Sequence, residues 1–168
     1  MSKLIILGAG GYARTITDIA KQSGKHEEIF YLDDYKQTSD ILGKCCDFKK
    51  FISPNIEFYP AIGDNTARLE WIDKLILAKA DIATFIHSTA YVSPTAVVGV
   101  GVAVLPNAVV NTGCVIQDGV IVNCGSVVDH DAIVNRGAHI CPCAVVKPLT
   151  EVPVMLRIEP NVTFDGKK

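Results

Sequence analysis

The sequence carries almost no excess charge and no long apolar segment. Its 168 residues have a formal net charge of −2, so it lacks the basic patch by which proteins bind nucleic acid or an anionic membrane. The first apolar stretch is short and runs into glycines, unlike a signal peptide. The longest apolar runs fall far below the length that spans a bilayer. We therefore expect a cytoplasmic protein that neither binds nucleic acid nor inserts into a membrane.

The sequence also lacks any CxxC pair, although it has six cysteines. In a cytosolic protein these are expected to be reduced thiols rather than disulfides. His139, Cys141 and Cys143 alternate and could share one face of a strand, but structural zinc usually takes four ligands from CxxC-like knuckles. We therefore expect no metal site, and we interpret these cysteines as occupants of small positions in a repeat.

That repeat is an aliphatic residue every six positions, without a gap. The series is Ile86, Val92, Val98, Val104, Val110, Ile116, Val122, Val128, Val134, Ile140 and Val146. Four residues after each of the first ten stands a small or compact residue: Ala90, Ala96, Val102, Ala108, Cys114, Val120, Ser126, Ala132, Ala138 and Ala144. An amphipathic helix repeats near 3.6 and a half-buried strand at 2. A period of six predicts short strands joined by identical corners, which is a β-solenoid.

Residues 1–82 follow a different pattern, in which strands alternate with helices. Short apolar strands are predicted at 3–7, 29–32 and 56–62, with helices over 13–23 and from 66 to about 80. A glycine turn after the first strand and an acidic pair after the second are typical of the mononucleotide-binding half of a doubly wound fold. About 80 residues hold only one such half, which favours a mononucleotide or nucleotide-sugar over NAD.

The glycines of this turn have a chemical reason. A backbone without Cβ lets phosphate oxygens reach N–H groups at a helix N-terminus. The acidic pair is placed to accept hydrogen bonds from ribose hydroxyls or base N–H groups, and Asn65 can cap the following helix. A purely structural turn and two solvated carboxylates are the alternatives. The predicted nucleotide-sugar site is Gly8, Gly10, Gly11, Asp33, Asp34, Gly63 and Asn65.

Both halves, in this order, resemble the bacterial left-handed β-helix acetyltransferases that modify UDP-amino-sugars or sialic acid. The matching stretches are GAGGYA at 8–13, YLDD at 31–34, AIGDN at 61–65, TFIHSTAYVSPTAVVG at 84–99 and IVNCGSVVDHDAIV at 121–134. The resemblance implies a left-handed coil and a homotrimer with active sites between neighbouring β-helices. It implies acetyl-CoA as the acyl donor. It makes His130 the general base and Asp131 its orienting carboxylate, with Asn123 near the acceptor amine and His139 near the thioester.

The chemistry supports the role of His130 independently of the resemblance. Acetyl transfer to an amine requires removal of a proton, for which imidazole is suited near neutral pH. An adjacent carboxylate can fix the tautomer of the ring and stabilise the imidazolium. His130 falls two residues after the inward Val128, so we expect it to project outward from a corner rather than to be buried.

The sequence departs from the family at two places. Cys143 stands where members often carry glycine, so a larger side chain could narrow the path of the pantetheine arm of acetyl-CoA. After Val146 the hexads are expected to stop, because Pro148, Pro153 and Pro160 would each remove a donor from the strand ladder. The last residues are therefore predicted to cap the open end of a solenoid of about 3.3 coils.

The prediction is an α/β Rossmann-like half domain at 1–82, a left-handed parallel β-helix at 83–147 and a capping tail at 148–168. The predicted function is acetyl-CoA-dependent acetylation of the amine of a UDP-4-amino-sugar in bacterial glycan biosynthesis. One alternative is O-acetylation of sialic acid or another sugar hydroxyl. Another is a non-catalytic trimer that binds nucleotide-sugars and has a truncated CoA site. The homotrimer is also indicated by aliphatic residues expected to point outward: Val97, Val109, Val115, Ile121, Val127 and Ile133.

Overall fold

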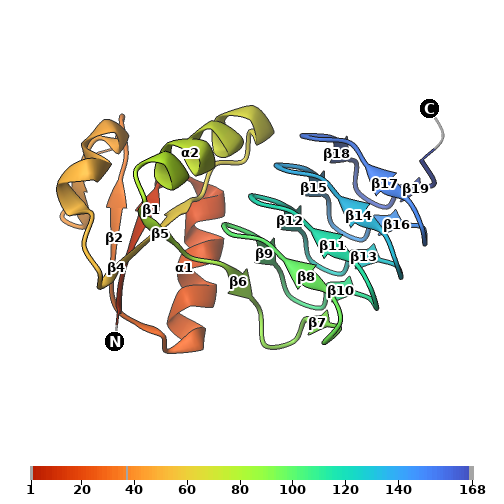
Figure 1. The fold of residues 1–168 in the computed structure, drawn as a ribbon. Helices are drawn as coiled ribbons and strands as arrows, with labels where there is room; N and C mark the ends of the chain where they lie inside the picture. Colours follow the sequence, from red (N-terminus) through yellow and green to blue (C-terminus); the bar gives the residue numbers. More distant parts are fainter. Residues whose placement is uncertain (1, 37, 167–168) are drawn as a thin grey trace. The chain divides into compact units, whose positions relative to one another are not determined.

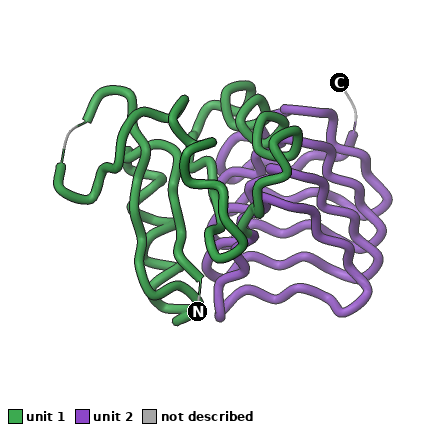
Figure 2. Tube along the Cα trace, turned by 60° about the vertical axis from the view of Figure 1, so that its left-hand side comes forward, with its two compact units in different colours: residues 1–83 green, residues 84–168 purple. Residues whose placement is uncertain are grey.

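The computed structural model describes residues 2–36 and 38–166. The chain divides into two compact units, Met1–Ala83 (unit 1) and Thr84–Lys168 (unit 2), which Figure 2 shows in different colours. The division lies one residue from the boundary that the sequence predicts. Each unit has its own hydrophobic core, and each is described by itself below.

Unit 1 is built on a parallel sheet of five strands in the order β3-β2-β1-β4-β5 (Figure 1). Its elements are β1 (Ser2–Leu7), α1 (Gly11–Ser23), β2 (His26–Leu32), β3 (Ile41–Gly43), the 3-10 helix η1 (Cys45–Phe51), β4 (Ile56–Pro60), α2 (Asn65–Leu77) and β5 (Asp81–Ile82). From β1 the chain adds strands on one side and then, with β4 and β5, on the other. The order therefore reverses between β1 and β4, and in doubly wound folds ligands bind at such a switch point.

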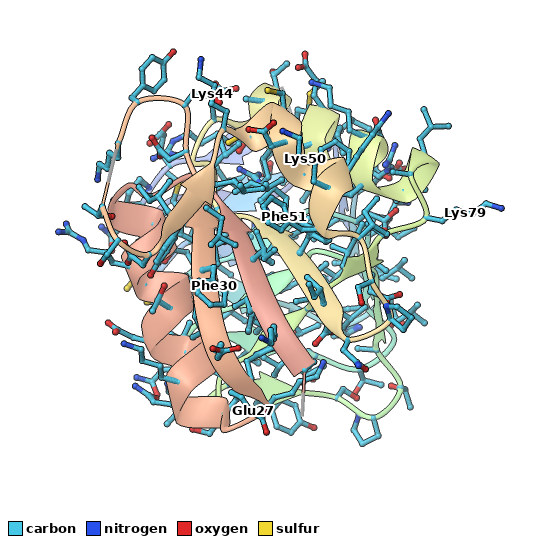
Figure 3. The ribbon with its side chains drawn as sticks, turned by 90° about the vertical axis from the view of Figure 1, so that its left-hand side faces the viewer. Glu27, Phe30, Lys44, Lys50, Phe51 and Lys79 are labelled. Atoms are coloured by element: carbon cyan, nitrogen blue, oxygen red, sulfur yellow. The ribbon has the colours of Figure 1, made fainter. Side chains whose placement is uncertain are left out.

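Side chains on the two faces of this sheet explain its helices. Helix α1 buries Ala13, Ile16 and Ile19 along one stripe and ends at Gly24, which adopts a left-handed conformation (φ +64°). On the opposite side of the sheet, Ile5, Leu7 and Phe58 belong to a buried cluster with Phe48 of η1 and Leu75 of α2. Phe30 and Phe51, labelled in Figure 3, pack against this cluster and are partly buried. The strands predicted at 3–7, 29–32 and 56–62 all form, whereas β3, η1 and β5 were not predicted.

Unit 2 is a solenoid of two-residue parallel strands joined by four-residue corners (Figure 1). The strands are β6 (Phe85–Ile86), β7 (Tyr91–Val92), β8 (Val97–Val98), β9 (Ala103–Val104), β10 (Val109–Val110), β11 (Val115–Ile116), β12 (Ile121–Val122), β13 (Val127–Val128), β14 (Ile133–Val134), β15 (His139–Ile140), β16 (Val145–Val146), β17 (Glu151–Val152), β18 (Arg157–Ile158) and β19 (Thr163–Phe164). They form three sheets, β18-β15-β12-β9-β6, β19-β16-β13-β10-β7 and β17-β14-β11-β8. Successive coils pair in register, as Val110 does with Val128.

The second residue of each strand points into the solenoid and forms its core. Val110, Val128 and Val146 are fully buried, and small residues such as Ala108 and Ala144 join them in one cluster. Ile86 is the exception, with 48% of its surface exposed, because it lies in the first coil and has a neighbouring coil on one side only. From Val92 to Val146 the hexad pattern therefore predicts the inward residues of unit 2 one by one.

The prediction that the hexads stop at Val146 and that 148–168 form a cap is wrong. Strands β17, β18 and β19 pair with β14, β15 and β16, so the repeat continues through Phe164. Pro148 and Pro160 stand at the second corner position, whose N–H takes no part in the backbone hydrogen bonds between coils; at the same position, His130 donates its N–H to the side chain of Asp129. Pro153 lies in the last described coil and has no later described coil to bond. Proline is therefore compatible with all three positions.

Candidate functional site

The carboxyl end of β1 forms a glycine loop that exposes the start of helix α1. Gly8 has φ +90°, and a Cβ there would meet the carbonyl oxygen of Ala61 at 3.4 Å, so glycine permits the close approach of the β1 and β4 loops. Gly10 is the N-cap of α1, and its extended backbone offers no capping side chain. The first turn of α1 contains no acidic residue. The N–H groups at this helix start and the helix dipole suit an anion such as phosphate.

Asp33, at the end of β2, holds this loop in place. Its carboxylate accepts hydrogen bonds from the backbone N–H of Ala9 at 2.7 Å, of Tyr35 at 2.9 Å and of Lys36 at 2.8 Å. Partial burial would raise the pKa of Asp33, but the backbone hydrogen bonds from Lys36, Tyr35 and Ala9 outweigh it and lower that pKa. The carboxylate is therefore ionised and already holds the backbone.

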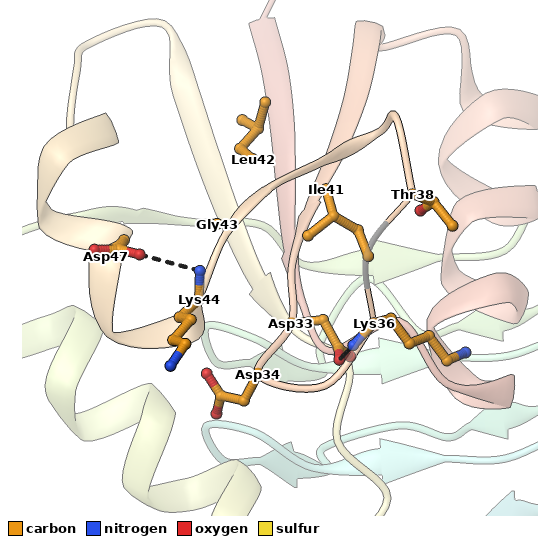
Figure 4. A pocket seen from close by; sticks show the side chains of 9 residues that line it. All are labelled: Asp33, Asp34, Lys36, Thr38, Ile41, Leu42, Gly43, Lys44 and Asp47. Carbon is orange, nitrogen blue, oxygen red and sulfur yellow. Dashed lines mark hydrogen bonds between the residues drawn. The ribbon is translucent and has the colours of Figure 1, made fainter.

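A pocket of about 340 Å³ lies next to this carboxylate (Figure 4). It is lined by Asp33, Asp34, Lys36, Thr38, Ile41, Leu42, Gly43, Lys44 and Asp47. Asp34 accepts a hydrogen bond from the N–H of Cys45 at 3.0 Å, and the ammonium of Lys36 donates to the carbonyl of Ala9 at 2.5 Å. Neither Lys36 nor Lys44 is predicted from the sequence, since an isolated lysine in a loop carries no motif.

The start of α2 differs from its prediction. Asp64, not Asn65, is the N-cap, and its side chain accepts the N–H of Ala67 at 2.8 Å. The side-chain oxygen of Asn65 instead accepts a hydrogen bond from Arg68 at 2.8 Å. Aspartate and asparagine cap helices about equally well, so the sequence pair Asp64-Asn65 leaves the choice open. Asn65 thus supports the loop through Arg68, a residue that the sequence analysis did not single out.

In unit 2, His130 and Asp131 form an exposed pair at the corner between β13 and β14. Nδ1 of His130 lies 2.9 Å from Oδ2 of Asp131, and their side chains are 49% and 54% exposed. A carboxylate facing Nδ1 favours the tautomer with its proton on that nitrogen, which leaves the lone pair of Nε2 available. The outward projection expected for His130 is confirmed.

The geometry of this corner depends on a left-handed residue at its third position. Asp131 has φ +58°, as Gly113 and Gly125 at equivalent positions have φ +70° and +65°. A Cβ on Gly113, one coil earlier, would lie 2.3 Å from Oδ1 of Asp131. Asp131 therefore occupies a position that favours glycine, and the glycine below it provides the room for its carboxylate.

Asp129, the first residue of the same corner, was not predicted to matter. Its Oδ1 accepts the backbone N–H of His130 at 2.7 Å and the side-chain N–H of Asn111 at 3.0 Å. These two hydrogen bonds lower the pKa of Asp129. The ionised carboxylate fixes the backbone that carries His130.

A second cluster lies where β12 and β15 stack. Nε2 of His139 is 2.9 Å from the side-chain nitrogen of Asn123, and Nδ1 of His139 is 3.2 Å from Nη1 of Arg157. Arginine and the amide nitrogen of asparagine can only donate, and a neutral imidazole accepts at one of its two nitrogens, so His139 accepts a hydrogen bond from one of these two neighbours at a time. Arg157 comes from β18, in the segment predicted to be a cap, which is why the sequence analysis missed it.

Cys143 lies at the corner that follows β15. It has φ +58°, is exposed, and stacks over Gly125. This is the left-handed corner position, so its backbone favours the glycine that the sequence analysis expected there.

The predicted residues thus fall into three groups. Gly8, Gly10, Gly11, Asp33, Asp34, Gly63 and Asn65 lie at the carboxyl ends of the strands of unit 1. The structure pairs His130 with Asp131, and separately Asn123 with His139. Within residues 2–36 and 38–166, no group of three metal-ligating side chains comes together. None of the helices in the described part of the chain is long and apolar enough to span a bilayer.

Comparisons with known proteins agree with this architecture. The family model of the PglD N-terminal domain matches residues 3–75. The acetyltransferase domain of PglB from Neisseria gonorrhoeae is 32% identical, with a TM-score of 0.93 over 97% of this chain and 82% of that one. The same domain is known in complex with acetyl coenzyme A. PerB from Caulobacter crescentus, solved with CoA and GDP-perosamine, is 21% identical with a TM-score of 0.74 over 98% of this chain and 92% of that one, and it supports the fold alone.

A curated protein is also similar to this chain in sequence. UDP-N-acetylbacillosamine N-acetyltransferase of Bacillus subtilis is 29% identical over 112 residues, which are 62% of this chain. The match spans about half the length of that relative, 52%. The predicted Rossmann-like half domain and left-handed parallel β-helix are confirmed by these matches. The chain belongs to the hexapeptide-repeat family of left-handed β-helix acetyltransferases.

Proposed function

We propose that this protein transfers the acetyl group of acetyl-CoA to the amine of a nucleotide-linked amino-sugar. The observation that carries the proposal is the contact of 2.9 Å between Nδ1 of His130 and Asp131. A histidine so oriented on an exposed corner can remove a proton from an incoming nucleophile through Nε2. The relatives named for UDP-N-acetylbacillosamine and acetyl coenzyme A support this substrate pair.

The reaction needs a base that takes the proton of the amine and a group that stabilises the protonated base. The amine attacks the thioester carbonyl while His130 takes its proton, and the proton can then pass to the departing thiolate of CoA. Asp131 stabilises the imidazolium that forms. Asp129 positions His130 by accepting a hydrogen bond from its backbone N–H. Gly113 has no side chain and so leaves room for the carboxylate of Asp131.

Unit 1 supplies the nucleotide site in this proposal. Phosphates would lie at the start of α1, opposite Gly8, Gly10 and Gly11, where N–H groups and the helix dipole favour an anion. Asp33 and Asp34 line the neighbouring pocket, which suits the ribose or base. Lys36 and Lys44 add positive charge at its rim.

Asn123, His139 and Cys143 are proposed to face the acetyl donor and the acceptor amine. Asn123 and His139 already contact each other, and Cys143 lies at the next corner of the same stack. A truncated CoA site would require a solenoid that ends at Val146. Strands continue to β19, so the length of the solenoid does not favour a non-catalytic protein.

We further propose a cytoplasmic homotrimer with active sites between subunits. Among the outward aliphatic residues, Val97 is 62% exposed and Ile133 37% exposed, and burying such side chains favours association. Ile121 is the exception in that predicted set, because it is only 1% exposed.

Calorimetry and a transfer assay test the function together. The full chain is titrated with acetyl-CoA, UDP-sugars and GDP-sugars, and then assayed for CoA release with 4-amino-sugar nucleotides and with sialic acid. Binding of both substrates with transfer to the amine is the expected result. Transfer to sialic acid alone would favour the O-acetyltransferase, and binding of a nucleotide-sugar without acetyl-CoA would favour the non-catalytic alternative.

A further inference from the structure

Arg68 is the largest charged group buried in unit 1 and has no role in the mechanism above. It lies in the first turns of α2 and is 0% exposed. Removing a charge from water costs several kcal/mol unless it is paired or hydrogen-bonded. A solvated lysine or an apolar residue would pack a helix at lower cost, so the position of Arg68 calls for an explanation.

Three hydrogen bonds of Arg68 go to the loop that joins β4 to α2 and to the first residue of α2. Nη1 donates to the carbonyls of Ile62 at 3.1 Å and Gly63 at 3.3 Å, and Nη2 donates to the side chain of Asn65 at 2.8 Å. A guanidinium presents its donors in a rigid fork. Two carbonyls of the loop and the side chain that follows them at the start of α2 are thus held by one planar group.

These contacts determine where the loop's N–H groups point. In a trans peptide the C=O and the following N–H are antiparallel, and the described peptide bonds include no cis bond. Because the carbonyls of Ile62 and Gly63 face Arg68, the N–H groups of Gly63 and Asp64 face away from it. Gly63 and Asp64 are exposed whereas Arg68 is buried, so these two N–H groups are directed toward the solvent side of the loop.

That side of the loop belongs to the switch point of the sheet. A Cβ added to Gly8 would touch the carbonyl of Ala61 at 3.4 Å and the side chain of Ile62 at 3.7 Å, so the β1 and β4 loops are neighbours. The start of α1 therefore lies beside outward N–H groups of the β4 loop. Two sets of N–H donors and a buried cation below one of them form a site suited to a diphosphate.

We infer that Arg68 is a positioning residue for the diphosphate of the nucleotide-sugar: it orients the Gly63 and Asp64 N–H groups toward the phosphates and adds a buried positive charge behind them. This inference rests on the proposed function, which places the nucleotide in unit 1. It also assigns Asn65 an indirect role, because its side-chain oxygen receives the guanidinium.

The test compares binding of a nucleoside diphosphate with that of its monophosphate. Wild type, Arg68→Lys and Arg68→Met are titrated calorimetrically with UDP and UMP, and with GDP and GMP. We expect both variants to lose about 10- to 100-fold in affinity for the diphosphate, which corresponds to one or two charge-assisted hydrogen bonds. Affinity for the monophosphate should fall less.

Lys74→Met is the matched control, since it removes an equal charge from an exposed position of the same helix. It should bind as the wild type does. Amide hydrogen exchange at Gly63 and Asp64 gives a second measurement: UDP should protect both amides in the wild type and not in Arg68→Lys. If Arg68→Met loses exchange protection throughout β1 and β4, unit 1 has unfolded in that variant. The comparison with wild type then uses Arg68→Lys, in which protection of β1 and β4 shows that unit 1 is folded.

Two outcomes overturn the inference and differ in meaning. If wild type binds UDP or GDP and folded Arg68→Lys binds it as tightly, the inference fails and the proposed function stands. If wild type binds neither diphosphate while it binds acetyl-CoA, the nucleotide assignment of unit 1 fails, and the role of Arg68 fails with it.

Discussion

Unit 1 and unit 2 are both parallel β structures, yet they are assembled on different principles. In unit 2 one corner and one two-residue strand are repeated, and Val110 pairs with Val92 before it and Val128 after it. In unit 1 the central strand pairs Leu4 with Ile29 on one side and with Glu57 on the other, and each connection is different. Unit 2 is determined by a local rule, whereas unit 1 depends on contacts between distant segments.

The difference extends to how each unit carries chemistry. The His130–Asp131 pair of unit 2 lies on a corner of the repeat and leaves the repeat intact, with Asp131 at a left-handed position that is glycine one coil earlier, at Gly113. The polar groups of unit 1 instead gather where strands end, with Asp33 holding Ala9 and Arg68 holding Ile62. This division predicts that changes in one unit affect one function and leave the other intact.

The largest effect is expected from His130→Ala. Loss of a positioned general base should lower kcat of acetyl transfer by about 10²–10⁴, with little change in the affinity for either substrate, since the imidazole acts in the transition state. Steady-state kinetics and calorimetry measure the two separately. His87→Ala, in the first corner of unit 2, is the matched control and should retain full turnover.

The outcome of the same experiment can also reassign the base. If His130→Ala keeps near wild-type turnover and His139→Ala abolishes it, the base is His139. If neither change matters to measurable transfer, base catalysis by these histidines is excluded.

The corresponding change in unit 1 is Gly10→Val, which is expected to affect nucleotide binding and not acetyl transfer chemistry. Gly10 has an extended backbone (φ −81°), and a Cβ there meets no described atom within 4 Å, so valine should fit without a clash inside the protein. It would occupy the space before α1 and should weaken UDP or GDP binding by about 10- to 100-fold. Calorimetry with the nucleotide and with acetyl-CoA checks this. Unchanged nucleotide affinity would show that the glycine loop has a structural role only.

A smaller effect is expected when Asp131 is moved or neutralised. Asp131→Asn should lower kcat about tenfold, because an amide orients the ring but stabilises the imidazolium less. Gly113→Ala should act in the same direction, since its Cβ would displace the carboxylate. Gly101→Ala adds a side chain at another left-handed corner (φ +66°) and is the matched control for backbone strain. Equal kinetics of the two alanine variants would contradict the orienting role of Asp131.

The smallest predicted difference concerns alkaline stability. Burial raises the pKa of Tyr59 to about 12 and that of Tyr12, which also faces Tyr59 at 2.7 Å, above its ordinary value. A raised folded-state pKa gives stability that is present below pH about 10 and is lost as pH rises toward about 12, on the order of 1–3 kcal/mol. Denaturant unfolding at several pH values between about 8 and 12 measures this loss.

Tyr59→Phe isolates the contribution of the phenol. Burial also raises the pKa of the thiol of Cys45 in unit 1 to about 11, and it raises the pKa of Cys114 and of Cys141 in unit 2. The wild type should lose more stability with rising pH than Tyr59→Phe does. Parallel pH profiles of the two proteins would contradict the prediction.

The sequence by itself determined the repeat of unit 2, its inward residues and the exposed corner with His130, because each depends on a period of six and on neighbours eighteen residues away in the same register. It also indicated the strand–glycine–helix turn of unit 1, since glycine at Gly8 and Gly10 and the strand before them are local signals. Where local signals suffice, sequence reasoning placed the elements correctly.

Only the tertiary structure decided which side chains complete the candidate sites. Arg68 and Arg157 lie outside every matching stretch, and Asp129 lies inside one without a role that the sequence assigns; their contacts are with carbonyls, an N–H group and a ring that the fold brings to them. The prolines of the last coil were misjudged because whether an N–H is needed depends on which coil lies beside it. Such partners are set by packing between segments, and no property of the residue itself reveals them.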